Sequence, residues 1–155
     1  MTPAIEVAKR AGISYTTHSY EHDPKHESFG MEAVEKLGLP ADQVFKTLVV
    51  SLEGKGLAVA VVPVSSKLDL KLLAKVLKVK KATMADARAV QRSSGYVLGG
   101  VSPLGQKRQL PSVIDASAEG FSTIYVSAGK RGLEIELDPR DLAQLLSATV
   151  AEIAK

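Results

Sequence analysis

Two apolar stretches separated by a short turn constrain the fold of this chain more than any other feature. The first, VFKTLVV, covers residues 44–50, the second, LAVAVVPV, covers residues 57–64, and the sequence EGKG lies between them. β-Branched and aromatic residues favour strands, in which side chains alternate between two faces. Both faces of the first stretch are mostly apolar. We therefore expect residues 44–51 to form a central strand, followed by a turn and a second strand.

Lys46 is the charged residue within the first stretch. Alternation places it on the same face as Val44, Leu48 and Val50, and places Thr47 on the opposite face. Burying an unpaired ammonium is costly, so such a group usually reaches water, pairs with a carboxylate or loses its proton. Two interpretations stay open. Lys46 lies near a strand end and reaches water or a carboxylate, or it lines a pocket and binds an anionic or carbonyl ligand.

The rest of the chain predicts helices mixed with shorter strands. A first helix is expected between the N-cap residue Thr2 and the stop residue Gly12, and a final helix is expected to begin near Asp138. Further helices are predicted at residues 29–37, 68–79 and 83–95, and further strands at 13–20, 112–115, 122–127 and 133–137. This order favours a mixed α/β fold over a regular βαβ array, and we expect residues 1–155 to form a single domain.

Composition narrows the classes of function. The chain has no cysteine, which excludes disulfides, thiolate metal sites and a cysteine nucleophile. It has no apolar run approaching the ~20 residues of a membrane span, and its first residues lack the apolar core of a signal peptide. We therefore expect a cytoplasmic protein. Tryptophan is absent and aromatic residues are few, which argues against a broad base-stacking platform.

Positive charge is concentrated in the middle of the chain. The formal net charge is +3, but the segment from Lys67 to Arg108 contains ten Lys or Arg residues against Asp69 and Asp86. That segment therefore carries +8 and the remaining residues carry −5. Such asymmetry is typical of a surface that faces a polyanion such as RNA, although lysine-rich helix faces are also common on ordinary solvated surfaces.

Several motifs associated with metal or nucleotide sites are incomplete. His18, His22 and His26 are spaced four apart, but Pro24 makes a helix that would align them improbable. The sequence SAGKRG at residues 127–132 lacks the first glycine and the Ser or Thr of a P-loop, and GxSxG does not occur. We expect neither a metal ion nor another cofactor.

Two groups of residues remain as site candidates. The first is the loop from Gly99 to Pro103, which is either an ordinary turn or a cradle whose N–H groups bind an anion or a carbonyl. The second is a hairpin in YVSAGKRGLEIEL, residues 125–137, which places Ser127 at a strand end. Glu134 and Glu136 share one face of its second strand. Each of the two could be exposed or could face Lys46.

Together these segments resemble the bacterial Cys-tRNA(Pro) deacylase family, called YbaK, within the prolyl-tRNA synthetase editing-domain superfamily. The resemblance covers essentially the whole chain and rests on VFKTLVV, the loop from Gly99 to Pro103, IYVSAGKRGLEIEL, and HSYEHDP with Tyr20. It implies a mixed α/β fold in which the sheet curls into a partly closed barrel flanked by helices. It also implies a stand-alone, trans-editing aminoacyl-tRNA deacylase that cleaves the ester at the tRNA 3′ end, most simply on Cys-tRNA(Pro).

The resemblance also implies roles for individual residues. Lys46 would be the catalytic residue and would hold the aminoacyl carbonyl or the phosphate of the terminal adenosine. Glu134, also an expected substrate-binding residue, stands where the family pattern has a shorter Asp, and the longer side chain would change the size of the pocket. The remaining expected substrate-binding residues are Tyr20, Thr47, Gly99, Gly100, Pro103 and Ser127.

The attacking group and the partners stay open at this stage. An aminoacyl ester is already activated, so either the substrate's own thiol or a water molecule could attack it, with the protein supplying proximity and oxyanion stabilisation. The aminoacyl-tRNA is the expected partner, and only the resemblance suggests prolyl-tRNA synthetase as a second one. The alternatives are a non-catalytic RNA- or protein-binding module of the same fold and a small-molecule or thioester hydrolase.

Overall fold

The structure, a computed structural model, describes residues 1–26 and 28–155. Its α-helices are α1 (Pro3–Ala11), α2 (Phe29–Leu37), α3 (Leu70–Val76), α4 (Ala87–Ser94) and α5 (Pro139–Leu146), and a 3-10 helix covers Ala116–Gly120. Its strands are β1 (Tyr15–Ser19), β2 (Phe45–Leu52), β3 (Gly56–Pro63), β4 (Ala82–Met84), β5 (Ser112–Asp115), β6 (Ile124–Lys130), β7 (Leu133–Leu137) and β8 (Thr149–Ala151). In these residues no helix has the length and apolar character that crossing a membrane requires.

Capping residues explain where the helices begin and end. The Thr2 side chain accepts a hydrogen bond from the Ile5 N–H, and Gly12 ends α1 with φ 71° in the left-handed region. The helix predicted at 68–79 is shorter than expected because Asp69 caps its start. The helix predicted at 83–95 begins only at Ala87, because Asp86 is its N-cap and the preceding residues form β4.

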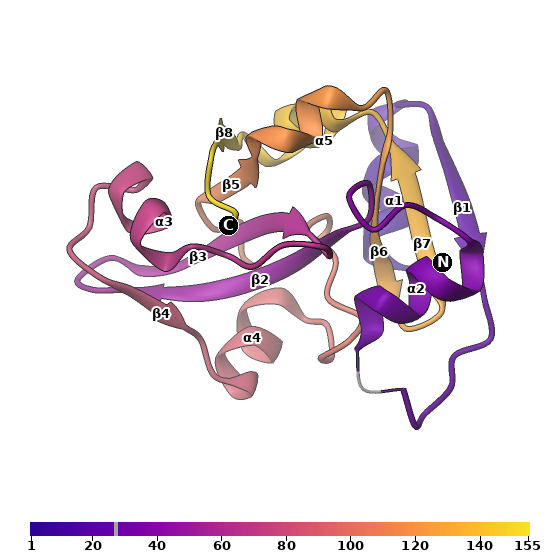
Figure 1. Cartoon of the computed structure of the whole chain (residues 1–155), viewed down its shortest axis with the longest axis horizontal. Helices are drawn as coiled ribbons and strands as arrows, with labels where there is room; N and C mark the ends of the chain where they lie inside the picture. Colours follow the sequence, from indigo (N-terminus) through magenta and orange to yellow (C-terminus); the bar gives the residue numbers. More distant parts are fainter. Residues whose placement is uncertain (27) are drawn as a thin grey trace.

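The strands form two sheets. The larger has the order β4-β2-β3-β5-β8, and the smaller has the order β1-β7-β6 (Figure 1). β2 is antiparallel to β3 and β4, whereas β3 and β5 are parallel, so the larger sheet is mixed. A bridge between Val44 and Tyr125 links the two sheets at the start of β2. The mixed α/β fold is confirmed, and closure of the sheets into a barrel stays a prediction.

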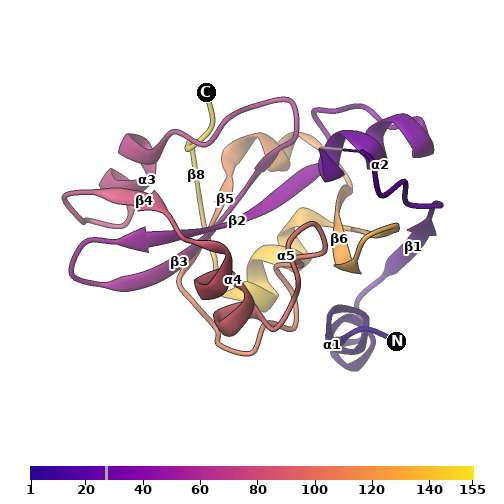
Figure 2. The same ribbon diagram turned by 90° about the horizontal axis from the view of Figure 1, so that it is seen from below.

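Helices cover both faces of the larger sheet. Buried Leu73 of α3 packs with Val50 and Val62 on one face. Val90 of α4 packs with Val49 and Val61 on the opposite face, together with the core that the smaller sheet, α1 and α5 share. Figures 1 and 2 show α3 and α4 on opposite sides of β2 and β3, as this division of the core requires.

One edge of β2 carries a gap between two partner strands. β3 pairs along the whole of the other edge, from Phe45 to Leu52. On the gapped edge, β4 pairs only with Val50–Leu52, and β6 joins only at Val44. Residues 45–49 therefore have no strand beside them on this edge in the described chain, and of their carbonyl oxygens that of Val49 accepts a hydrogen bond from the Ala85 N–H at 3.0 Å. Sheet edges present unpaired N–H and C=O groups, so this gap leaves backbone polar groups available next to the site described below.

Candidate active site

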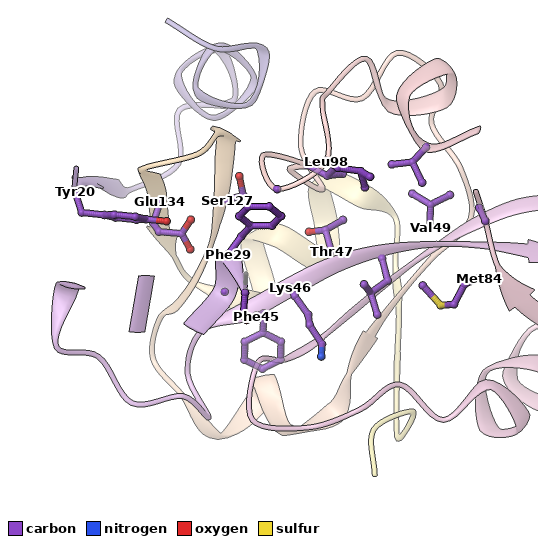
Figure 3. Close-up of a pocket in the computed structure, with 17 residues that line it drawn as sticks. Tyr20, Phe29, Phe45, Lys46, Thr47, Val49, Met84, Leu98, Ser127 and Glu134 are labelled. Carbon is purple, nitrogen blue, oxygen red and sulfur yellow. The ribbon is translucent and has the colours of Figure 1, made fainter. Parts of the chain in front are cut away.

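A pocket of about 450 Å³ lies at the gap in the edge of β2 (Figure 3). The β2 residues Phe45 to Val49 form one wall, and β6 and β7 contribute Ser127 and Glu134. Ser127 lies in the middle of β6 and not at a strand end as expected, because β6 continues to Lys130. The remaining lining residues come from the chain after β1, the start of α2, the β4–α4 region and the loop after α4: Tyr20, Ser28, Phe29, Gly30, Met84, Ala85, Val90, Leu98, Gly99 and Val101. The lining is mainly apolar with a few polar groups, as is usual for a site that binds a small organic group.

Lys46 and Thr47 line this pocket although they belong to opposite faces of β2. Figure 3 shows their side chains leaving the strand in opposite directions. Both residues line the pocket because it lies at the strand edge, where the two faces meet. The Thr47 hydroxyl is buried and has no hydrogen-bond partner in the described chain. A buried hydroxyl without a partner is costly, so this group is placed to bind a ligand.

The surroundings of Lys46 lower the pKa of its ammonium. Burial is the larger cause, because it disfavours the charged form, and the positive charge of Lys67 adds to it. No carboxylate within residues 1–26 and 28–155 forms an ion pair with Lys46. Glu136 instead accepts hydrogen bonds from His18 and Thr123, at 2.8 and 2.6 Å. Of the two alternatives that the sequence left open for Glu136, the one in which it faces Lys46 is not observed, and Lys46 is a partly buried cation that lines a pocket.

Tyr20, Ser127 and Glu134 give one side of the pocket a polar character. Ser127 and Glu134 are paired residues of β6 and β7. Glu134 is only 7% exposed, and burial raises the pKa of its carboxyl to about 8. Burial, then the charges of Glu134 and Glu32, raise the pKa of Tyr20 to about 12. At neutral pH both groups are mainly protonated, so each can donate a hydrogen bond to a ligand.

The glycine loop contributes to the pocket in part. Gly99 lines the pocket, whereas Gly100 and Pro103 do not. A Cβ on Gly100 would lie 2.8 Å from the Lys130 Cα, so this glycine lets the loop pack against the β6–β7 turn. Pro103 lies in a separate hollow beside Val7 and Leu145, because the loop has by then turned towards α1 and α5. Gly100 and Pro103 therefore do not contact the pocket directly.

Several apolar lining residues were not predicted as site residues from the sequence, among them Phe29, Leu48, Met84 and Leu98. Met84 and Leu98 are each 50% exposed, which is high for such large apolar side chains. Leu48 belongs to the same face of β2 as Lys46, so strand alternation could have identified it. The other three lie in segments whose approach to β2 depends on tertiary structure, and no local sequence signal identifies them.

The three evenly spaced histidines lie in three different ion pairs. His18 contacts Glu136, His22 contacts Glu32, and His26 contacts Glu35, with N–O distances of 2.8, 2.6 and 3.1 Å. Glu32 is fully buried; its pKa is lowered to about 2 because hydrogen bonds from the Asp23 N–H, His22 and Lys36 outweigh the cost of burial. These histidines therefore anchor separate parts of the chain instead of converging on one point.

Comparison with known proteins gives consistent matches. The family model of the aminoacyl-tRNA editing domain matches residues 25–145. An Enterococcus faecalis protein, EbsC, named as a candidate Cys-tRNA(Pro)/Cys-tRNA(Cys) deacylase, is 37% identical over 98% of this chain and 92% of its own length. Bacillus subtilis YwhH is 28% identical over 73% of this chain and 71% of its own. A crystal structure described as a candidate trans-editing enzyme for prolyl-tRNA synthetase shares the fold, with a TM-score of 0.80 at 20% identity over 100% of this chain and 99% of that chain.

Proposed function

Because this chain belongs to the aminoacyl-tRNA editing domain family, we propose that it deacylates mischarged tRNA in trans, with Cys-tRNA(Pro) as the main substrate. The observation that carries this proposal is the pocket at the edge of β2. In it, Lys46, which pairs with no carboxylate of the described residues, and Thr47, whose buried hydroxyl has no hydrogen-bond partner among them, line one cavity beside a glycine loop. A polar ester in a mainly apolar pocket would satisfy both groups.

The reaction needs little from the protein beyond positioning and charge stabilisation. When a nucleophile attacks the aminoacyl carbonyl, negative charge develops on the carbonyl oxygen, and the Lys46 ammonium stabilises it. A cation in a partly dry pocket acts more strongly on that charge than it would in water. The carbon–oxygen ester bond then breaks, and the ribose oxygen leaves with a proton. A water attacker releases the free amino acid, and a substrate thiol attacker releases a small cyclic thioester.

The other polar residues would orient the aminoacyl group. Thr47 would hydrogen-bond the ester region, since this residue lines the cavity and its buried hydroxyl has no partner among residues 1–26 and 28–155. Tyr20, Ser127 and protonated Glu134 would bind polar atoms on the opposite side of the substrate. Such fixed partners restrict the reacting atoms to few orientations, which lowers the barrier to attack.

The tRNA itself would contact the basic segment from Lys67 to Arg108. In the part of the chain that the structure describes, none of its ten Lys and Arg side chains forms an ion pair with Asp or Glu. Contacts with phosphates would be sensitive to salt and largely independent of sequence. Prolyl-tRNA synthetase would then be the partner that supplies the choice of tRNA.

A panel of Cys-, Ala- and Ser-tRNA(Pro) tests the proposal. We expect the wild-type protein to deacylate Cys-tRNA(Pro) fastest. Lys46→Ala should abolish this activity with an unchanged circular dichroism spectrum, and Thr47→Val should reduce kcat/KM by about 10-fold. Lys55→Ala, in the exposed turn between β2 and β3, is the matched control and should retain wild-type activity.

The same panel separates the alternatives. If Cys is the only amino acid released from tRNA(Pro), the substrate thiol is the attacking group. If Ala is released as well, water is the attacking group. If the protein binds the tRNAs without deacylating any of them, it is a non-catalytic binding module and not an enzyme. Turnover of free aminoacyl esters at the same rate as the tRNAs would indicate a small-molecule hydrolase.

A further inference from the structure

Arg131, in the turn between β6 and β7, contacts two separate walls of the pocket. Its Nε and Nη2 atoms donate hydrogen bonds to the Leu98 carbonyl oxygen, at 3.2 and 2.8 Å. Its guanidinium carbon lies 4.2 Å from the centroid of the Phe29 ring, which is within cation–π range. Leu98 and Phe29 line the pocket from the loop after α4 and from the start of α2, and Figure 3 shows both beside the cavity.

The loop is shaped to fit this arginine. Gly99 has φ +87°, and a Cβ at this position would lie 2.5 Å from the Arg131 Nε and 2.8 Å from the Phe29 ring. The next residue, Gly100, packs against the backbone of Lys130 and donates a hydrogen bond to the Val97 carbonyl oxygen at 3.0 Å. Arg131, Phe29 and Gly99 therefore fill one small space without room for another side chain.

A guanidinium is suited to this role in a way that an ammonium is not. Its planar fork can place two N–H groups on one carbonyl oxygen while its face lies on an aromatic ring. Arg131 is itself exposed, and it does not line the pocket. Its contacts with the site are those with Leu98, Gly99 and Phe29.

We propose that Arg131 is a positioning residue that holds the 97–101 loop and Phe29 in the arrangement that forms the pocket. Its effect on catalysis rests on the proposed deacylase function, whereas its effect on the loop does not. Without the guanidinium, the Leu98 carbonyl loses two donors and Phe29 loses its cover. The loop should then open more often while the rest of the fold is retained.

Amide hydrogen exchange tests the effect on the loop without reference to activity. In Arg131→Ala, the Gly100 amide should exchange on the order of 10-fold faster than in wild type, with unchanged exchange in β2 and β3 and a similar thermal midpoint. Arg131→Lys should behave nearly like Arg131→Ala because it lacks the fork. The control is Arg140→Ala, which removes an exposed arginine that pairs with Asp138 and should leave the loop unchanged. Wild-type exchange at Gly100 in Arg131→Ala would overturn the proposal.

Kinetics test the consequence for the reaction. We expect kcat for Cys-tRNA(Pro) to fall on the order of 10- to 100-fold in Arg131→Ala, with a much smaller change in KM. Added guanidinium ion should restore part of this loss, which it would not do for a general folding defect. A loosened loop with wild-type kcat would refute the positioning role. If wild-type protein deacylates nothing, the proposed function fails, and the exchange experiment still decides whether Arg131 holds the loop.

Discussion

At the residue scale, burial determines the charge of the main polar groups in the pocket. It lowers the pKa of Lys46 and raises the pKa of Glu134, so both groups move towards their neutral forms. The sequence indicated Lys46 because a lysine in an apolar strand is conspicuous. It could not indicate the state of Glu134, since the same alternating pattern would fit an exposed glutamate on the outer face of a sheet.

The buried Glu134 should make stability depend on pH. Its pKa is about 8 in the folded protein and near its ordinary value of 4.5 in the unfolded chain. Between pH 4.5 and pH 8, the Glu134 carboxyl is mainly protonated in the folded protein and mainly ionised in the unfolded chain. The free energy of unfolding should therefore fall as pH rises through this window, by at most about 1.4 kcal/mol per pH unit, and level off above pH 8. In Glu134→Gln, this pH-dependent part of the free energy of unfolding should be absent.

Urea unfolding of the two proteins between pH 5 and 9 measures the difference. The stability of Glu134→Gln relative to wild type should increase with pH across this range. Glu119→Gln changes an exposed carboxylate on the 3-10 helix, so its difference from wild type should stay flat. A flat difference for Glu134→Gln as well would mean that Glu134 is ionised in the folded protein at neutral pH.

At the element scale, the helices and most strands were predictable, and the two three-residue strands, β4 and β8, were not. Caps such as Thr2, Asp138 and Gly12 are local signals, and they located helix ends to within a few residues. β4 and β8 have three residues each and exist because β2 and β5 lie beside them. No local pattern encodes that pairing. The same limit explains why the sequence grouped Pro103 with Gly99, although Gly99 lines the pocket and Pro103 lies elsewhere.

The contact between the glycine loop and the β6–β7 turn leads to a prediction for Gly100. A methyl group there would lie 2.8 Å from the Lys130 Cα and 3.1 Å from the Arg131 backbone nitrogen, and backbone atoms cannot yield as a flexible side chain can. Gly100→Ala should reduce the free energy of unfolding by about 1–3 kcal/mol and also reduce deacylation. Chemical denaturation measures the first effect.

Gly120 provides the matched control. A Cβ on Gly120 would meet no atom within 4 Å. Gly120→Ala should therefore change stability by no more than about 0.5 kcal/mol. Equal stabilities for the two alanine variants would show that the loop does not pack tightly against the β6–β7 turn.

At the scale of the whole molecule, the basic segment from Lys67 to Arg108 and the smaller sheet lie in different regions. Figure 1 shows α3 and α4 with the larger sheet, and α1 near the smaller one. Exposed Arg88 and Arg92 are one helical turn apart on α4, and Val90 of the same helix lines the pocket. The sequence identified the basic segment, but only the fold shows that it includes a wall of the pocket.

Charge reversal tests whether this region binds tRNA. Arg88→Glu with Arg92→Glu should weaken tRNA binding and make the slope of log K against log salt shallower, by roughly 0.7–0.9 for each lost phosphate contact. Lys9→Glu with Arg10→Glu makes the same change of charge on α1 and should have a smaller effect. Fluorescence anisotropy across a salt series measures both. Equal losses in the two double variants would indicate attraction by net charge alone, without a defined binding face.

The interruption along β2 has a consequence for how this architecture can change. The length of β4 sets the size of the opening, since each additional paired residue would cover part of Val49, Leu48 or Thr47. Extending β4 would complete the hydrogen bonding of the sheet and should strengthen the fold, while closing the cavity. If this pocket is the active site, a more regular β-sheet at this position would therefore remove the activity.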